Sequence, residues 1–123
     1  MSERLYALRG ATSVPENSAE AIRAATEELM RVLIERNELE IDRFVSCIFT
    51  ATDDLNAEFP ALAARNIGFD RVPLICTREI DVPGALPRVI RVLAHYYAPD
   101  GHVARHVYLG EARSLRADLD AAQ

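Results

Sequence analysis

The chain has 123 residues and a mass of 13.7 kDa, which predicts one domain and excludes two independent cores. Half of the residues are apolar, 27% are charged, and the net charge of −5 argues against a general affinity for nucleic acid or an anionic membrane. All 14 basic residues are arginine, so chemistry that needs a lysine, such as a Schiff base or a Walker-type phosphate contact, is excluded.

The two cysteines and the hydropathy pattern bear on the compartment. Cys47 and Cys76 both lie in apolar runs without Cys-x-x-Cys spacing, and the N-terminus has no secretory leader. No apolar stretch approaches the roughly 20 residues that cross a bilayer. The sequence therefore predicts a reduced, cytoplasmic protein with no membrane partner.

The first half of the chain predicts a strand, a helix and a second strand. Residues 4–9 alternate in polarity and Gly10 ends the run, as in a short strand. Asn17 offers a helix cap, and apolar residues then recur at helical spacing to about Arg36. Residues 44–51 are apolar, aromatic and β-branched, which is typical of a central strand buried on both faces.

The second half predicts two more helices and two more strands. A short helix is expected over 60–68, with proline at its first position and glycine at its end. A third strand is expected over 71–77, followed by an amphipathic helix over 81–97 whose apolar residues recur at helical spacing. After a Pro-Asp-Gly turn, a fourth strand is expected over 104–110. The predicted order is β-α-β-α-β-α-β.

Residue spacing supports neither metal binding nor nucleophilic catalysis. His102 and His106 are four residues apart, but they straddle a turn and a predicted strand and would not share a helix face. The chain has no Gly-x-Ser-x-Gly motif, and no histidine lies near Cys76 in the sequence. The simpler interpretation of Cys76 is a small buried apolar residue.

The positions of the arginines are more informative than their number. Arg9 lies beside Gly10, where the backbone can approach a ligand closely. The other three of interest lie at the end of the short helix, in the predicted third helix and in the tail: Arg65, Arg91 and Arg116. For any one of them, a solvated surface charge is the simpler interpretation. Arg91 would share a face of the predicted third helix with Arg88 and His95, opposite the apolar stripe. That face lies either in water or in a cleft, and periodicity does not decide between the two.

Local strings along the whole chain resemble those of one enzyme family. They are RGAT at 9–12, TATDDLNAEFPA at 50–61, VPLICTREIDVPGAL at 72–86, IRVL at 90–93, RHVYL at 105–109 and LRADL at 115–119. In this order they resemble the monofunctional chorismate mutases of the trimeric α+β class. The resemblance implies one domain over 1–123, with a mixed β-sheet and helices on one face in a ferredoxin-like arrangement. It also implies a homotrimer with a barrel-like core and active sites between subunits.

The resemblance implies an isomerase that converts chorismate to prephenate in phenylalanine and tyrosine biosynthesis. This pericyclic rearrangement breaks one C–O bond and forms one C–C bond within a single molecule. It moves no proton and needs no covalent intermediate, cofactor or metal. Its catalyst holds the flexible substrate in a reactive shape and stabilises the charge that appears as the ether bond stretches. Guanidinium groups suit both tasks, because they grip carboxylates at two points and keep their charge.

The resemblance also implies a set of site residues. Arg91 would donate to the ether oxygen, and Glu79 would accept from the ring hydroxyl. Arg9 would bind a substrate carboxylate. Further residues implied to bind substrate are Phe59, Ala61, Arg65, Leu74, Cys76, Tyr108, Leu115 and Arg116. Family members often carry lysine where this chain has Leu62 and threonine where it has Ile75, so a long-range attraction for substrate is missing at position 62.

The sequence leaves two other functions open. Small trimeric proteins that hydrolyse enamines and imines also hold a substrate carboxylate with arginine, and such a protein would release ammonia from imino acids. A regulatory module would bind a metabolite of the aromatic pathway without converting it. The full set of matching strings favours the mutase over both.

Overall fold

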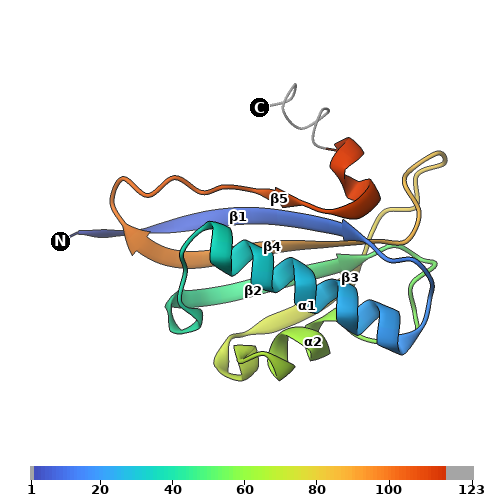
Figure 1. The fold of residues 1–123 in the computed structure, drawn as a ribbon, viewed down its shortest axis with the longest axis horizontal. Coiled ribbons are helices and arrows are strands. Elements are labelled where there is room, and N and C mark those ends of the chain that lie inside the picture. The colour runs from blue at the N-terminus through green and yellow to red at the C-terminus, as the bar shows by residue number, and fades with distance from the viewer. Residues whose placement is uncertain (1, 116–123) are drawn as a thin grey trace.

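The computed structural model describes residues 2–115 and shows a mixed α+β domain (Figure 1). Its strands and helices are β1 (Glu3–Ser13), α1 (Ala19–Arg36), β2 (Phe44–Ala51), α2 (Pro60–Asn66), β3 (Leu74–Arg78), β4 (Val89–Pro99) and β5 (Val107–Tyr108). Three short 3-10 helices accompany them: η1 (Ile41–Arg43) precedes β2, η2 (Phe69–Arg71) precedes β3, and η3 (Gly110–Ser114) follows β5. Neither α-helix in this part of the chain combines the length and the apolar character that crossing a membrane requires.

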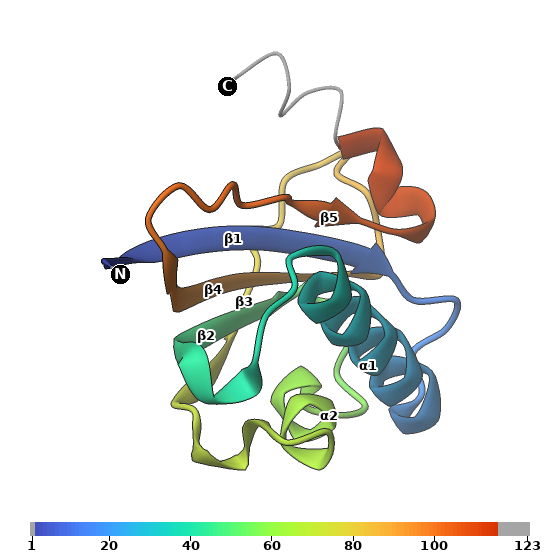
Figure 2. The same cartoon turned by 60° about the vertical axis from the view of Figure 1, so that its left-hand side comes forward.

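One five-stranded sheet forms the centre of the fold, with strand order β3-β2-β4-β1-β5. β4 pairs antiparallel with both β1 and β2, whereas β3 runs parallel to β2 and β5 runs parallel to β1. Both α-helices lie on the same side of the sheet (Figure 2). The expected mixed sheet with helices on one face is confirmed.

Helix α1 covers the sheet with an apolar stripe, as the sequence predicts. Its buried residues include Ile22, Leu29 and Leu33, at the spacing that places them on one face. The cap is Ser18 rather than Asn17, because the Ser18 hydroxyl accepts from the backbone N–H of Ala21.

The two faces of the sheet differ sharply in what covers them. Leu8, Phe49 and Tyr96 are fully buried on the helix side. On the opposite face, which we call the open face, Leu5 and Leu93 are 51% and 36% exposed. Within residues 2–115 neither α-helix packs on the open face, so most of the side chains that point to this side are exposed or half-buried.

The helix predicted over 81–97 is wrong, because this segment forms a loop followed by β4. The apolar spacing that suggested a helix includes Leu93 and Tyr97, and both are exposed. In β4 every second residue from Ile90 to Ala98 is buried instead. β4 forms ladders with a neighbour on each side, and this long-range pairing outweighs the helical spacing.

Other predicted strands need smaller corrections. The first strand does not end at Gly10 but continues to Ser13. β2 matches 44–51 and is interior to the sheet, yet it is fully buried on one face only, because Ser46, Ile48 and Thr50 on the other face are half-buried. The fourth predicted strand shrinks to β5, and the third begins at Leu74, after η2 and a proline.

Gly10 lets α1 lie close to the sheet. A Cβ added there would lie 3.1 Å from Val92 Cγ1, 3.2 Å from Leu29 Cδ1 and 3.3 Å from Leu33 Cδ1. A side chain at this position would force these neighbours to shift by a few tenths of an ångström, so glycine suits the close approach of α1, while pairing with β4 continues the strand to Ser13.

We expect Gly10→Val to lower the free energy of unfolding by about 1–3 kcal/mol, because the added methyl groups overpack the contact between α1 and the sheet. Urea unfolding at a fixed subunit concentration measures this change. Ala24→Val, on the exposed side of α1, is the control and is expected to cost about 0.5 kcal/mol. Equal losses in the two variants would contradict the packing argument.

Candidate active site

A cavity of about 280 Å³ lies on the open face, across β1, β2, β4 and β5. It is lined by Arg9, Gly10, Ala11, Ile48, Thr50, Arg91, Val92, Leu93 and Tyr108. Strand register explains why these residues meet, since Ala11 of β1 pairs with Arg91 on one side and with Tyr108 on the other. Arg9 is two residues away on the same face of β1. The result is an apolar floor beneath two guanidinium groups and a phenol.

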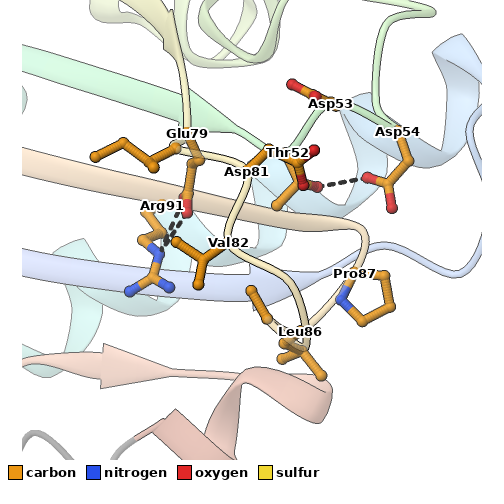
Figure 3. A pocket seen from close by; sticks show the side chains of 11 residues that line it. Thr52, Asp53, Asp54, Glu79, Asp81, Val82, Leu86, Pro87 and Arg91 are labelled. Atoms are coloured by element: carbon orange, nitrogen blue, oxygen red, sulfur yellow. Dashed lines mark hydrogen bonds and ion pairs between the residues drawn. The ribbon is translucent and has the colours of Figure 1, made fainter.

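Arg91 also borders a second cavity of about 210 Å³, formed mainly by the loop between β3 and β4 (Figure 3). There Glu79 holds the Arg91 side chain, with Arg91 Nε lying 2.9 Å from Glu79 Oε2 and 3.2 Å from Oε1. The Glu79 side chain is 15% exposed and that of Arg91 is 42% exposed. The ion pair therefore sits at the wall between the two cavities, where it is partly shielded from water.

The end of this loop is fastened just before Arg91. The Asp54 carboxylate accepts from the backbone N–H of Arg88, with distances of 3.0 and 3.1 Å. Thr52 Oγ1 donates to Asp54 at 2.5 Å and accepts from the Val89 N–H at 3.0 Å. Arg88 itself has a φ of 49°, a conformation that non-glycine residues seldom adopt. Together these contacts fix how the loop enters β4, and so where Arg91 stands relative to the loop's first residues.

Tyr108 contributes a buried donor to the open-face cavity. Its hydroxyl has no hydrogen-bond partner in the part of the chain that the structure describes. A buried hydroxyl without a partner is costly, and such groups in proteins usually meet a ligand, a water or another subunit. The position of this hydroxyl beside two arginines suits the carboxylate of a small anion.

The backbone of Arg9 is held by a histidine. The Arg9 N–H donates to His106 Nδ1 at 3.0 Å, so the imidazole accepts at that nitrogen and carries its proton on Nε2. Burial, followed by the Arg9 charge, lowers the pKa of His106. Both effects favour the neutral imidazole that this contact needs.

A third cavity, of about 370 Å³, lies at the β3 edge of the sheet beside the start of α2. Phe59 and Cys76 line it, and Phe59 is 67% exposed. Cys76 pairs with Phe49, whose side chain points into the core under the helices. The cavity with Cys76 is therefore separated by the sheet from the cavity with Arg9.

Comparison with known proteins identifies the family. Residues 5–119 match the family model for chorismate mutase type I. The chain belongs to the type I chorismate mutase family. A chorismate mutase of Thermus thermophilus is 51% identical over 119 residues, covering 94% of this chain and 97% of that protein. For a chorismate mutase of Bacillus subtilis the identity is 39% over 115 residues, with coverages of 91% and 90%.

A solved structure supports the same assignment. A chorismate mutase from Clostridium thermocellum matches with a TM-score of 0.85 and 47% identity, covering 89% of this chain and 98% of that one. The resemblance seen in the sequence is thereby confirmed. So are the function and class inferred from it: a chorismate mutase, an isomerase of aromatic amino acid biosynthesis.

The structure of this mutase separates the predicted site residues into groups. It brings Arg9, Glu79, Arg91 and Tyr108 together, and it places Phe59 and Cys76 in another cavity. Four predicted residues line none of these three cavities: Ala61 is buried, Arg65 is exposed on α2, and Leu74 and Leu115 are half-buried. Arg116 lies outside the described residues.

Sequence reasoning also erred on or missed several features of the site. Arg91 stands on a strand, so it shares its face with His95 but not with Arg88, which lies in the loop. His106, considered only as a metal ligand, contacts Arg9 instead, and no cluster of three metal-ligating side chains occurs among residues 2–115. Thr50 was missed, although its place two residues after Ile48 on a strand is a signal that both face the same way.

We expect His106 to make the folded protein less stable in acid. Its folded pKa lies below its unfolded value, so its contribution is complete above about pH 6.5 and is lost as the pH falls through the folded pKa. The urea midpoint of the wild type should therefore fall more between about pH 7.5 and pH 5 than that of His106→Asn. Asparagine is the matched variant because its carbonyl accepts the Arg9 N–H without titrating. An equal fall in both proteins would contradict this role.

Proposed function

We propose that this mutase converts chorismate to prephenate in clefts between the subunits of a homotrimer. The observation that carries the proposal is that the site residues implied by the family resemblance line two different cavities of one chain. Arg9, Arg91 and Tyr108 line a cavity on the open face, whereas Phe59 and Cys76 line one at the β3 edge. Because the sheet separates the two cavities, one chain alone holds two halves of different sites, and a neighbour completes each of them.

The apolar open face supports assembly. Leu5, Ile75, Leu93 and Tyr97 are 51%, 57%, 36% and 43% exposed on it. They form two groups on this face: Leu5 pairs with Tyr97, and Ile48 pairs with both Leu93 and Ile75. Exposed apolar side chains grouped on one sheet face are typical of a surface covered by another subunit.

The substrate is held first by its charges. Chorismate carries two carboxylates, and Arg9 with the Tyr108 hydroxyl, which has no hydrogen-bond partner among residues 2–115, would bind one of them. The apolar floor of the cavity would face the carbon framework, with Phe59 of a neighbouring subunit as a second wall. Ala61, Arg65, Leu74 and Cys76 would join from that neighbour, and Leu115 would add to the apolar wall.

Arg91 would supply the main stabilisation of the transition state. Its Nε is already bound to Glu79, which leaves the two terminal amino groups for the ether oxygen as that atom gains negative charge. Glu79 would accept from the ring hydroxyl and face the carbon atoms that become electron-poor. The C–O bond then breaks and the C–C bond forms without a proton, a cofactor or a covalent intermediate.

A cytoplasmic location completes the proposal. Cys47 and Cys76 are both free thiols, and burial raises the pKa of Cys47 to about 12. Two unpaired cysteines in a small protein suit a reducing compartment.

We expect Arg91→Ala to lower kcat by at least about 10²–10³-fold, because it removes a preorganised donor that acts in the transition state. Arg91→Lys should also be impaired, since a point charge does not replace the planar fork. The loss of chorismate ultraviolet absorbance, with prephenate identified as product, measures both variants. Arg36→Ala, at the exposed end of α1, is the control. Near-normal turnover in Arg91→Ala would refute the role assigned to Arg91. Release of ammonia from imino acids by the wild-type protein would favour the enamine and imine hydrolase, and binding of chorismate without turnover would favour the regulatory module.

Mixed oligomers test whether neighbouring subunits share a site. Arg91→Ala and Arg65→Ala alter different halves of the proposed site, and each variant alone is expected to have an activity about 10²-fold below that of the wild type. After the two are unfolded and refolded together in equal amounts, about one site in four should combine two intact halves. Activity should then recover to about a quarter of the wild-type value. If the mixture shows only the summed activity of the two variants refolded alone, each site belongs to a single chain.

A further inference from the structure

The hydroxyl of Thr50 makes a contact that the roles above leave unused. Thr50 lies on the open face of β2 and pairs directly with Arg91 of β4. Its Oγ1 donates to Glu79 Oε2 at 2.6 Å. This is a short hydrogen bond to a charged acceptor, and such bonds are stronger than those between neutral groups.

Glu79 Oε2 is the atom on which two donors meet. It accepts from Thr50 Oγ1 at 2.6 Å and from Arg91 Nε at 2.9 Å. The backbone of Glu79 is fixed as well, because its N–H donates to Ala51 O at 3.0 Å. With the backbone and one carboxylate oxygen both held by β2, the carboxylate has little freedom to turn.

The position of the Arg91 guanidinium depends on that carboxylate. Only Nε of Arg91 makes hydrogen bonds to residues within 2–115, and all of them go to Glu79. A carboxylate held by a long arginine alone could move with it, whereas Thr50 is β-branched and stiff on its strand. Thr50 therefore ties the ion pair to the rigid sheet.

We propose that Thr50 is a positioning residue, which fixes the Glu79 carboxylate so that Glu79 holds Arg91 by Nε and leaves its terminal amino groups free for the substrate. The inference rests on the proposed function, in which those amino groups act on the ether oxygen. Thr50 itself need not touch the substrate. Displacing a catalytic group by about 1 Å can lower the rate by about 10²-fold, so we expect losing the Thr50 contact to lower the rate by up to that factor.

The test compares Thr50→Val with Thr50→Ser. Valine keeps the shape and the strand preference but has no hydroxyl, so the fold is retained. We expect kcat of Thr50→Val to fall by about 10- to 100-fold with KM changing less than about threefold, because the lost alignment matters most in the transition state. Thr50→Ser should stay within about threefold of the wild type, since it keeps the donor.

Thr26→Val is the matched control. Thr26 is buried in α1, and its hydroxyl donates to Ile22 O at 2.7 Å, away from the site. We expect kcat within about twofold of the wild type, so that losing a buried threonine hydroxyl elsewhere does not imitate the Thr50 effect. A loss in Thr26→Val as large as in Thr50→Val would overturn the proposal.

A second measurement follows Arg91 directly. The side-chain Nε–H signals of the 14 arginines can be recorded by ¹⁵N NMR, and the Arg91 signal is the one missing in Arg91→Lys. This signal should shift in Thr50→Val and stay in place in Thr50→Ser. If turnover falls in Thr50→Val while the Arg91 signal does not move, Thr50 does not act on Arg91 through Glu79 and the proposal is wrong.

The remaining outcomes separate this inference from the proposed function. Wild-type turnover in Thr50→Val, with Arg91→Ala and Glu79→Gln strongly impaired, overturns the positioning role and leaves the function intact. Equal losses in Thr50→Val and Thr50→Ser also overturn it, because serine keeps the hydroxyl and the loss of that donor would then not explain the effect. Full activity in Arg91→Ala overturns the proposed function and this inference with it.

Discussion

The ion pair between Glu79 and Arg91 is the interaction on which the site depends. It joins the loop that leaves β3 to the strand that follows the loop, and it stands at the wall between two cavities. A guanidinium group acts on developing charge only if it is oriented beforehand, since reorientation during the reaction would consume the stabilisation. Glu79 orients Arg91 through a contact to Nε alone. This contact leaves both terminal amino groups of the guanidinium available for a ligand.

The sheet makes this arrangement possible because its two faces have different tasks. The helix side is packed with residues such as Phe49 and Tyr96 and provides stability. The open face carries the cavity proposed to bind substrate, and strand register sets Arg91 and Tyr108 on either side of Ala11 there. In the proposed trimer, an identical neighbour supplies the missing wall of the pocket.

Much of the fold follows from local patterns, and one large error shows where they fail. Helix α1, strand β2 and helix α2 were predicted from caps, apolar runs and prolines, because these signals act within a few residues. In the segment that becomes β4, apolar residues satisfy a helical and a strand period together. The ladders with β1 and β2 decide between them, and those partners lie far away in the chain.

The sequence by itself determined the kinds of groups available and, through its local strings, the family. Because the chain has arginine and no lysine, the side chains that bind any anion are guanidinium groups. Only the tertiary structure decided which groups meet: Thr50 lies 29 positions from Glu79, and Arg9 lies 97 positions from His106. It also decided that Cys76 lies across the sheet from Arg9. The reason is that no short window of residues encodes strand register and sheet order. Register and order bring residues that are distant in the sequence side by side, and they place residues that are close in the sequence on opposite faces of the sheet.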